Sequence, residues 1–156
     1  MTDNFEISII SNIVKVIKQK CDKKIINNIL FPIMCNELNT PIIIVLDKHK
    51  NIVIGYLIYN LRIEDNSIYI DYIEVNPDYR NESLCKNMIS YLISNKKEVN
   101  KYELLNVGGL SGYSCYTDAF TNNNFEAKFI EDENINNNNN IALNKQFNGD
   151  MIFTRL

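Results

Sequence analysis

Apolar residues in the first 40 positions recur at the spacing of an α-helix. Two sets share gaps of one, three or four positions: Ile9, Ile10, Ile13, Val14 and Ile17, then Ile25, Ile26, Ile29, Leu30 and Ile33. This spacing places the apolar side chains of each set on one face of a helix. We therefore expect residues 1–40 to form two N-terminal helices that end before Pro41.

After Pro41 the pattern changes to runs of β-branched and aromatic residues. The runs are PIIIVLD, NIVIGYLIYN and SIYIDYIEV, at residues 41–47, 51–60 and 67–75. The links between them are polar, and short polar links between such runs are typical of hairpins. The three runs predict an antiparallel meander, with His49 in an exposed turn rather than in a catalytic site.

Helical and extended patterns alternate through the rest of the chain. A helix is predicted at residues 83–95, with one apolar face that packs on the sheet: Leu84, Cys85, Met88, Ile89, Leu92 and Ile93. The elements predicted after it are a strand at 103–107, a loop entering a short helix at 108–120, and strands at 125–130 and 149–156. Residues 131–148 are rich in asparagine, so we expect a flexible loop there, because such a segment buries too little apolar area to offset its ordering entropy.

Length and composition indicate one domain over residues 1–156. The chain has 156 residues, 46% of them apolar, and a net charge of −3. No cluster of basic residues predicts a nucleic-acid partner, and no apolar run of about 18 residues predicts a membrane span. We expect a cytoplasmic protein.

The cysteines predict neither a metal site nor a redox motif. Cys21, Cys35, Cys85 and Cys115 are scattered, without a C-x-x-C pair or a spaced histidine partner. We interpret them as small buried apolar side chains.

The stretch YIEVNPDYRNESLCKNMISYL, residues 72–92, joins a strand to a helix through a proline turn. Ile73-Glu74-Val75 ends the strand, Asn76 to Tyr79 form the turn, and Arg80 to Cys85 lead into the helix. This stretch resembles the acetyl-CoA motif of the GCN5-related N-acetyltransferase superfamily, with Ser83 and Cys85 at two positions where the family has glycine or another small residue. The resemblance implies an α/β (α+β) fold with a mixed, mostly antiparallel central sheet flanked by helices.

The resemblance also implies where acetyl-CoA, as co-substrate, would bind. Unpaired N–H groups and the macrodipole make a helix N-terminus suited to a pyrophosphate, and small residues let phosphate approach the backbone. In the alternative interpretation, Ser83 is an ordinary helix N-cap with no anion nearby. The positions carried over from the family are Ile73, Val75, Arg80, Asn81, Glu82, Ser83, Leu84, Cys85, Lys86 and Ser111.

A second family motif, Tyr-x-x-x-Gly-Phe, is matched in altered form by Phe120 to Phe125. Asn124 replaces the glycine at an expected left-handed turn, which asparagine tolerates. Phe120 replaces a tyrosine that protonates the departing thiolate in many relatives, and phenylalanine has no proton to donate. Tyr116, one helical turn earlier, is our candidate acid; its alternative role is packing in the core.

Two carboxylates before the turn are candidates for the base that takes a proton from the acceptor amine. Asp71 and Glu74 are three positions apart on a strand, so alternation predicts that they face opposite sides of the sheet and that only one faces the acceptor. Glu74 is the first candidate and Asp71 the second. Either can instead be an exposed carboxylate or the partner of a basic side chain.

The resemblance predicts an N-acetyltransferase that transfers an acetyl group from acetyl-CoA to a primary amine of a small molecule, protein or peptide by direct attack. The changes at Ser83, Cys85 and Phe120 favour an alternative: a family member without turnover that binds CoA or a protein partner. The acceptor is not identified, no metal is expected, and a homodimer is an assembly that the sequence leaves open.

Overall fold

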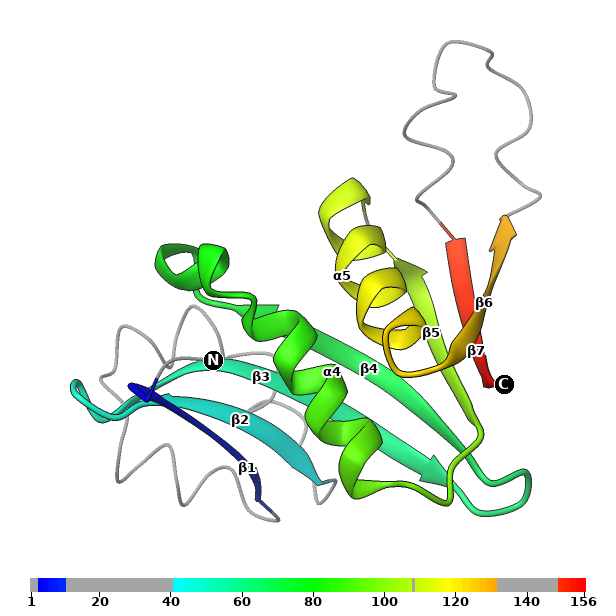
Figure 1. Cartoon of the computed structure of the whole chain (residues 1–156), viewed down its shortest axis with the longest axis horizontal. Helices are drawn as coiled ribbons and strands as arrows, with labels where there is room; N and C mark the ends of the chain where they lie inside the picture. Colours follow the sequence, from blue (N-terminus) through cyan, green and yellow to red (C-terminus); the bar gives the residue numbers. More distant parts are fainter. Residues whose placement is uncertain (1–2, 11–40, 108, 132–148) are drawn as a thin grey trace, which may run out of the picture.

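The computed structural model describes residues 3–10, 41–107, 109–131 and 149–156 (Figure 1). The elements are β1 Phe5–Ile10, β2 Ile42–Asp47, β3 Ile52–Arg62, β4 Ser67–Val75, the 3-10 helix η2 Pro77–Glu82, α4 Leu84–Asn95, β5 Lys101–Val107, α5 Gly109–Thr121, β6 Phe125–Glu131 and β7 Gly149–Arg155. Within these ranges the strands form one seven-stranded sheet in the order β1-β2-β3-β4-β5-β7-β6.

The two helices α4 and α5 lie side by side on one face of the sheet (Figure 1). Helix α4 packs across β2, β3 and β4, and α5 packs against α4 and β6. The core between them includes Leu57 and Tyr59 of β3, Met88 and Leu92 of α4, and Phe153 of β7. The predicted fold class, a mixed and mostly antiparallel sheet with helices, is therefore confirmed.

The predicted meander is confirmed, and so is the helix that follows it. Strands β2, β3 and β4 pair antiparallel in sequence order, and His49 is exposed in the β2–β3 turn. Leu84, Met88, Ile89, Leu92 and Ile93 form the buried face of α4. Helix α5 begins at Gly109, so most of the stretch expected to be a loop is already helical.

The prediction of a helix beginning near Ile9 is wrong, because residues 5–10 form strand β1. Ile9 lies opposite Ile43 and Ile10 opposite Ile42 in an antiparallel pair with β2. The sequence FEISI alternates apolar and polar residues at 5–9, which is a strand period, and pairing with β2 supplies the backbone hydrogen bonds. The rest of the predicted N-terminal helices, and the asparagine-rich loop from residue 132 to 148, lie outside the described residues.

Strands β4 and β5 are parallel neighbours whose pairing ends partway along. The ladder runs from Ser67 opposite Lys101 to Ile70 opposite Leu104. Beyond that point the strands diverge toward their carboxyl ends, with α4 and α5 in front of them (Figure 1). Residues 71–75 of β4 therefore have β3, but no paired residue of β5, beside them.

Candidate active site

The turn after β4 has a backbone conformation that explains why glycine is favoured there. The side chain of Asn76 accepts a hydrogen bond from the Asp78 N–H at 3.0 Å, and Pro77 starts η2. Ser83, between η2 and α4, has φ 57° and ψ 25°, which is left-handed, and its side chain makes no capping hydrogen bond. Ser83 is therefore the N-cap residue of α4 by position, as the alternative interpretation expects, but without a side-chain capping hydrogen bond.

This geometry leaves the start of α4 suited to an anion. The first N–H groups of an α-helix have no intrahelical acceptor, and Ser83 and Glu82 beside them are exposed. We call this segment, residues 80–86, the cradle. A glycine in the family pattern at position 83 serves two purposes: close approach of phosphate and a left-handed backbone.

Replacing Ser83 with glycine is expected to raise the free energy of unfolding by about 0.5–1 kcal/mol. Relief of a left-handed residue, about 1–2 kcal/mol, exceeds the added chain entropy of glycine, about 0.5–1 kcal/mol. Urea denaturation measures the change. Ser83→Ala, which keeps Cβ and removes only the hydroxyl, is the control and should not be stabilised. A Ser83→Gly protein less stable than wild type would contradict the strain argument.

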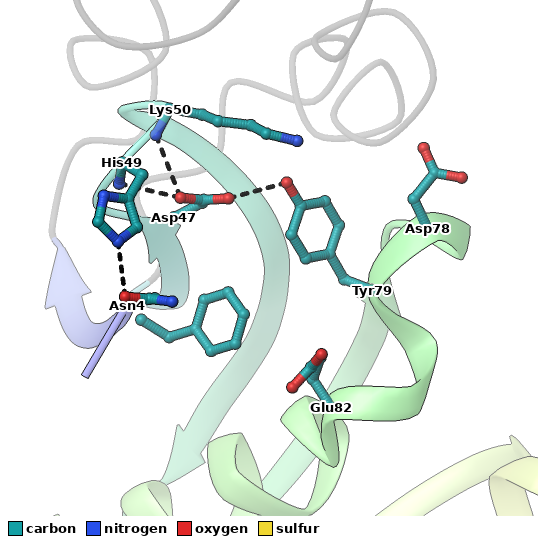
Figure 2. A pocket seen from close by; sticks show the side chains of 8 residues that line it. Asn4, Asp47, His49, Lys50, Asp78, Tyr79 and Glu82 are labelled. Atoms are coloured by element: carbon teal, nitrogen blue, oxygen red, sulfur yellow. Dashed lines mark hydrogen bonds between the residues drawn. The ribbon is translucent and has the colours of Figure 1, made fainter. Parts of the chain in front are cut away.

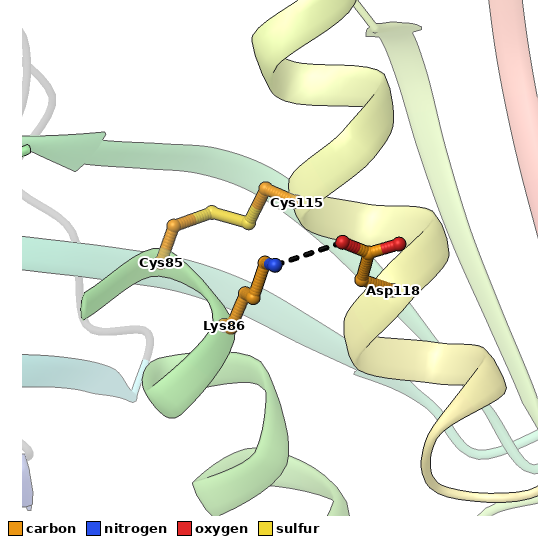
Figure 3. Close-up of a disulfide and its surroundings, with 4 residues drawn as sticks. All are labelled: Cys85, Lys86, Cys115 and Asp118. Atoms are coloured by element: carbon orange, nitrogen blue, oxygen red, sulfur yellow. Dashed lines mark hydrogen bonds and ion pairs between the residues drawn. A yellow bond between two sulfur atoms is a disulfide. The ribbon is translucent and has the colours of Figure 1, made fainter. Parts of the chain in front are cut away.

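Side chains around the cradle point in two directions. Glu82 lines a cavity of about 370 Å³ on the side of β1 and the β2–β3 turn, together with Asn4 and Phe5 (Figure 2). Cys85 and Lys86 instead point toward α5 (Figure 3). The Glu82 carboxylate is therefore directed away from the α5 side of the cradle.

A buried carboxylate anchors η2 to the rest of the fold. Asp47 is 6% exposed and accepts hydrogen bonds from the N–H groups of His49 and Lys50 at 3.0 and 3.1 Å and from the Tyr79 hydroxyl at 2.8 Å (Figure 2). Burial raises the pKa of Asp47, but the bonds from Lys50, Tyr79 and His49 together hold that pKa below its ordinary value. Sequence reasoning missed the Asp47–Tyr79 contact, because 32 positions separate the two residues.

A disulfide joins the cradle to α5, so the interpretation of all four cysteines as separate apolar side chains is wrong for two of them. Cys85 and Cys115 are bonded, with their Cα atoms 6.3 Å apart (Figure 3). One residue further along α4, Lys86 Nζ donates to Asp118 Oδ2 at 2.8 Å, an ion pair that is about half exposed. The position of Cys85 is thus set by α5 as well as by its place in the cradle.

The remaining predicted cradle residues divide by burial. Val75 and Leu84 are 9% and 1% exposed and Ile73 packs against the core, so their side chains belong to the packed interior beside the cradle. Arg80 is exposed. Asn81 is part of η2 and Ser111 is part of α5.

The expectation that Asp71 and Glu74 face opposite sides of the sheet is wrong. In the pairing with β3, Ile58 lies opposite Tyr72 and Tyr59 opposite Ile70, so Asp71 is an extra residue, a β-bulge. The bulge reverses the alternation between the two carboxylates. Both now lie on one face, where the Tyr56 hydroxyl donates to Glu74 Oε2 at 2.7 Å and the Asn60 amide donates to Asp71 Oδ2.

This face is the one away from α4. A Cβ added at Gly55 would lie 3.6 Å from Met88 Cε of α4, so Gly55 faces the helix and its neighbour Tyr56 faces the other way. Burial raises the pKa of Asp71, and the Asn60 bond and the Arg62 charge offset this only in part. Glu74 is partly exposed and lies on the end of β4 that pairs with β3 but not with β5.

The two aromatic residues considered for the acid lie in different surroundings. Phe120 is fully buried and stacks on Phe153, with ring centroids 4.0 Å apart. Tyr116 packs against the core but is partly exposed, and burial raises the pKa of its phenol. A phenol that stays protonated at neutral pH can donate a proton, so Tyr116 has the chemistry of an acid, whereas Phe120 is a core residue. Asn124 is left-handed, with φ 65°, as predicted.

Clusters of metal-binding side chains and membrane-spanning helices are both absent from the described residues. Within residues 3–10, 41–107, 109–131 and 149–156, no three His, Cys, Asp or Glu side chains come together in a way that could hold a metal ion. None of the helices described there has the length and apolar character needed to cross a membrane.

Comparison with known proteins identifies the family of this chain. The acetyltransferase (GNAT) family model matches residues 16–108, more than half of the 156 residues, and the chain belongs to this family. Members of the family use acetyl-CoA as co-substrate for acyl transfer. No curated protein matches the sequence.

Solved structures with the same fold include several acetyltransferases. A mutant spermidine N-acetyltransferase from Vibrio cholerae has a TM-score of 0.60 and 13% identity, covering 99% of this chain and 95% of that one. An acetyltransferase from Bacillus subtilis in complex with CoA has a TM-score of 0.60 and 11% identity, with coverages of 97% and 99%. The ribosomal-protein-S18-alanine N-acetyltransferase from Escherichia coli has a TM-score of 0.58 and 13% identity, with coverages of 96% and 93%. At these identities the similarity shows the fold alone.

Proposed function

We propose that this protein transfers the acetyl group of acetyl-CoA directly to a primary amine. The observation that carries the proposal is the position of the cradle. The cradle lies directly after the segment of β4 that is no longer paired with β5. Glu74, whose carboxylate accepts a hydrogen bond from the Tyr56 hydroxyl, lies on that segment. A phosphate site and a base are thus brought to the two sides of one strand.

The residues present fit CoA at the cradle. The N–H groups at the start of α4 provide donors for a pyrophosphate, the exposed Arg80 provides positive charge, and the left-handed Ser83 is exposed. A thioester supplies an activated acetyl carbon and a leaving thiolate. The cradle lies on the helix side of the sheet and Glu74 on the other, so the acceptor amine would approach from the side away from α4.

Each side chain then has a defined role in a balanced reaction. Glu74 takes a proton from the amine nitrogen, with Asp71 as the second candidate, and a carboxylate is suited to this step. The neutral nitrogen forms a bond to the acetyl carbon, its second proton passes to solvent, and the carbon–sulfur bond breaks. Tyr116 donates its proton to the departing thiolate, and solvent restores it.

The acceptor is proposed only as a class, a primary amine of a small molecule, protein or peptide. The names of two structures with this fold give spermidine in one and an alanine of a ribosomal protein in the other. An amine is a cation before it loses its proton, and the two carboxylates on one face, Asp71 and Glu74, attract positive charge.

The wild-type protein is expected to bind acetyl-CoA and to release free thiol with at least one amine of a panel. Glu74→Gln and Tyr116→Phe should each lower turnover by roughly 10²-fold, the low end for a positioned proton-transfer group, with acetyl-CoA affinity nearly unchanged. Isothermal titration measures the affinity and a thiol assay the turnover. Glu126→Gln, which neutralises an exposed glutamate on β6, is the matched control.

Binding of acetyl-CoA without turnover on any amine would favour the alternative function, a family member that binds CoA or a protein partner and has lost catalysis. The observation behind this alternative is that Phe120, at the family's tyrosine position, is fully buried among aromatic rings. Failure to bind acetyl-CoA would contradict both functions at the cradle.

A further inference from the structure

A buried tyrosine forms a hydrogen bond with the carboxylate that is proposed as the base. Tyr56 is 1% exposed, and its residue lies directly opposite Glu74 in the β3–β4 pairing. Its hydroxyl donates to Glu74 Oε2 at 2.7 Å. The contact joins a group with no access to solvent to one that is partly exposed.

Tyr56 is buried on a strand that is paired on both sides, whereas the Glu74 side chain has three rotatable torsions. Strand β3 pairs with β2 on one side and β4 on the other. Next to Tyr56, a Cβ added at Gly55 would lie only 3.3 Å from the Glu74 carbonyl oxygen, so the two backbones approach closely here. A ring fixed in this way restricts the three torsions of the Glu74 side chain through one hydrogen bond.

The direction of that bond is also determined. Burial, followed by the hydrogen bond to Glu74 and its charge, raises the pKa of the Tyr56 phenol far above its usual range. The phenol therefore stays protonated and donates to Glu74.

We propose that Tyr56 is a positioning residue for acetyl transfer: it holds Glu74 through Oε2 so that Oε1 takes the proton of the acceptor amine. The proposal rests on the proposed function and adds a residue that touches neither acetyl-CoA nor acceptor. It also gives the bulge at Asp71 a role, because the bulge is what turns Glu74 toward the face on which Tyr56 lies.

The test is a double-mutant cycle in the thiol-release assay. Tyr56→Phe should lower kcat roughly 10-fold, as expected for loss of one hydrogen bond to a charged group, with KM for acetyl-CoA within about twofold of wild type. In a Glu74→Gln background, Tyr56→Phe should have no further effect, because a residue that acts through another loses its role when that residue is removed. Tyr59→Phe is the matched control: Tyr59 is also 1% exposed on β3 but faces the helices.

The outcomes separate this proposal from the proposed function. Suppose that the wild type turns over and that the losses from Tyr56→Phe and Glu74→Gln multiply in the double variant. This result would overturn the positioning role and leave the proposed function in place. Equal losses from Tyr56→Phe and Tyr59→Phe, or a fall in acetyl-CoA affinity with Tyr56→Phe, would show a packing role and also overturn it. Absence of wild-type turnover on every amine would overturn the catalytic function, and the positioning role with it.

Discussion

Replacing Phe120 with alanine is expected to lower the free energy of unfolding by about 3–5 kcal/mol, the range for a buried aromatic side chain truncated to a methyl group. Phe120 has no exposed surface. Its ring stacks on Phe153 at 4.0 Å and lies 5.1 Å from Tyr102 and 5.5 Å from Phe125. Alanine would remove all three ring contacts and leave a cavity that the surrounding structure closes only in part. Urea denaturation followed by circular dichroism measures the loss.

Two further variants make the Phe120 result specific. Phe120→Leu keeps most of the buried volume and should lose less than alanine does. Ile63→Ala, at a position that is 85% exposed, should change stability by less than about 0.5 kcal/mol. A loss below about 1 kcal/mol for Phe120→Ala would contradict the place of Phe120 in the core.

Reduction of the Cys85–Cys115 disulfide is expected to lower the free energy of unfolding by about 3–4 kcal/mol. The bond closes a loop with a sequence separation of 30, and in the chain-entropy account a loop of about this length restricts the unfolded chain by that amount. Urea denaturation of the wild type with and without dithiothreitol measures the difference.

A variant with both Cys85→Ser and Cys115→Ser is the control for the disulfide. It should have the stability of the reduced wild type, and dithiothreitol should leave it unchanged. Cys21 and Cys35 are retained in both proteins, so any effect of the reductant on them is matched. Equal stability of oxidised and reduced wild type would contradict the prediction.

Much of the architecture is determined by local sequence. The runs of β-branched and aromatic residues in β2, β3 and β4 predict strands, and the spacing of the apolar face of α4 predicts a helix, so each pattern is visible within a dozen residues. Asn124 is similar: a left-handed turn favours glycine or asparagine whatever surrounds it, and its φ is 65°. The motif at residues 72–92 is equally local, because strand end, proline turn and helix start follow one another along the chain.

The tertiary structure decided what depends on partners distant in sequence. Strand β1 forms because β2 offers an edge to Phe5–Ile10, and the Cys85–Cys115 bond forms because α4 and α5 pack side by side. The bulge at Asp71 is a property of the pairing with β3, and it overturns the alternation predicted for Asp71 and Glu74. The sequence by itself determined which residues can donate, accept or pack; the pairing of strands and helices decided which of them meet, because contacts such as Tyr56–Glu74 join residues 18 positions apart that no local pattern links.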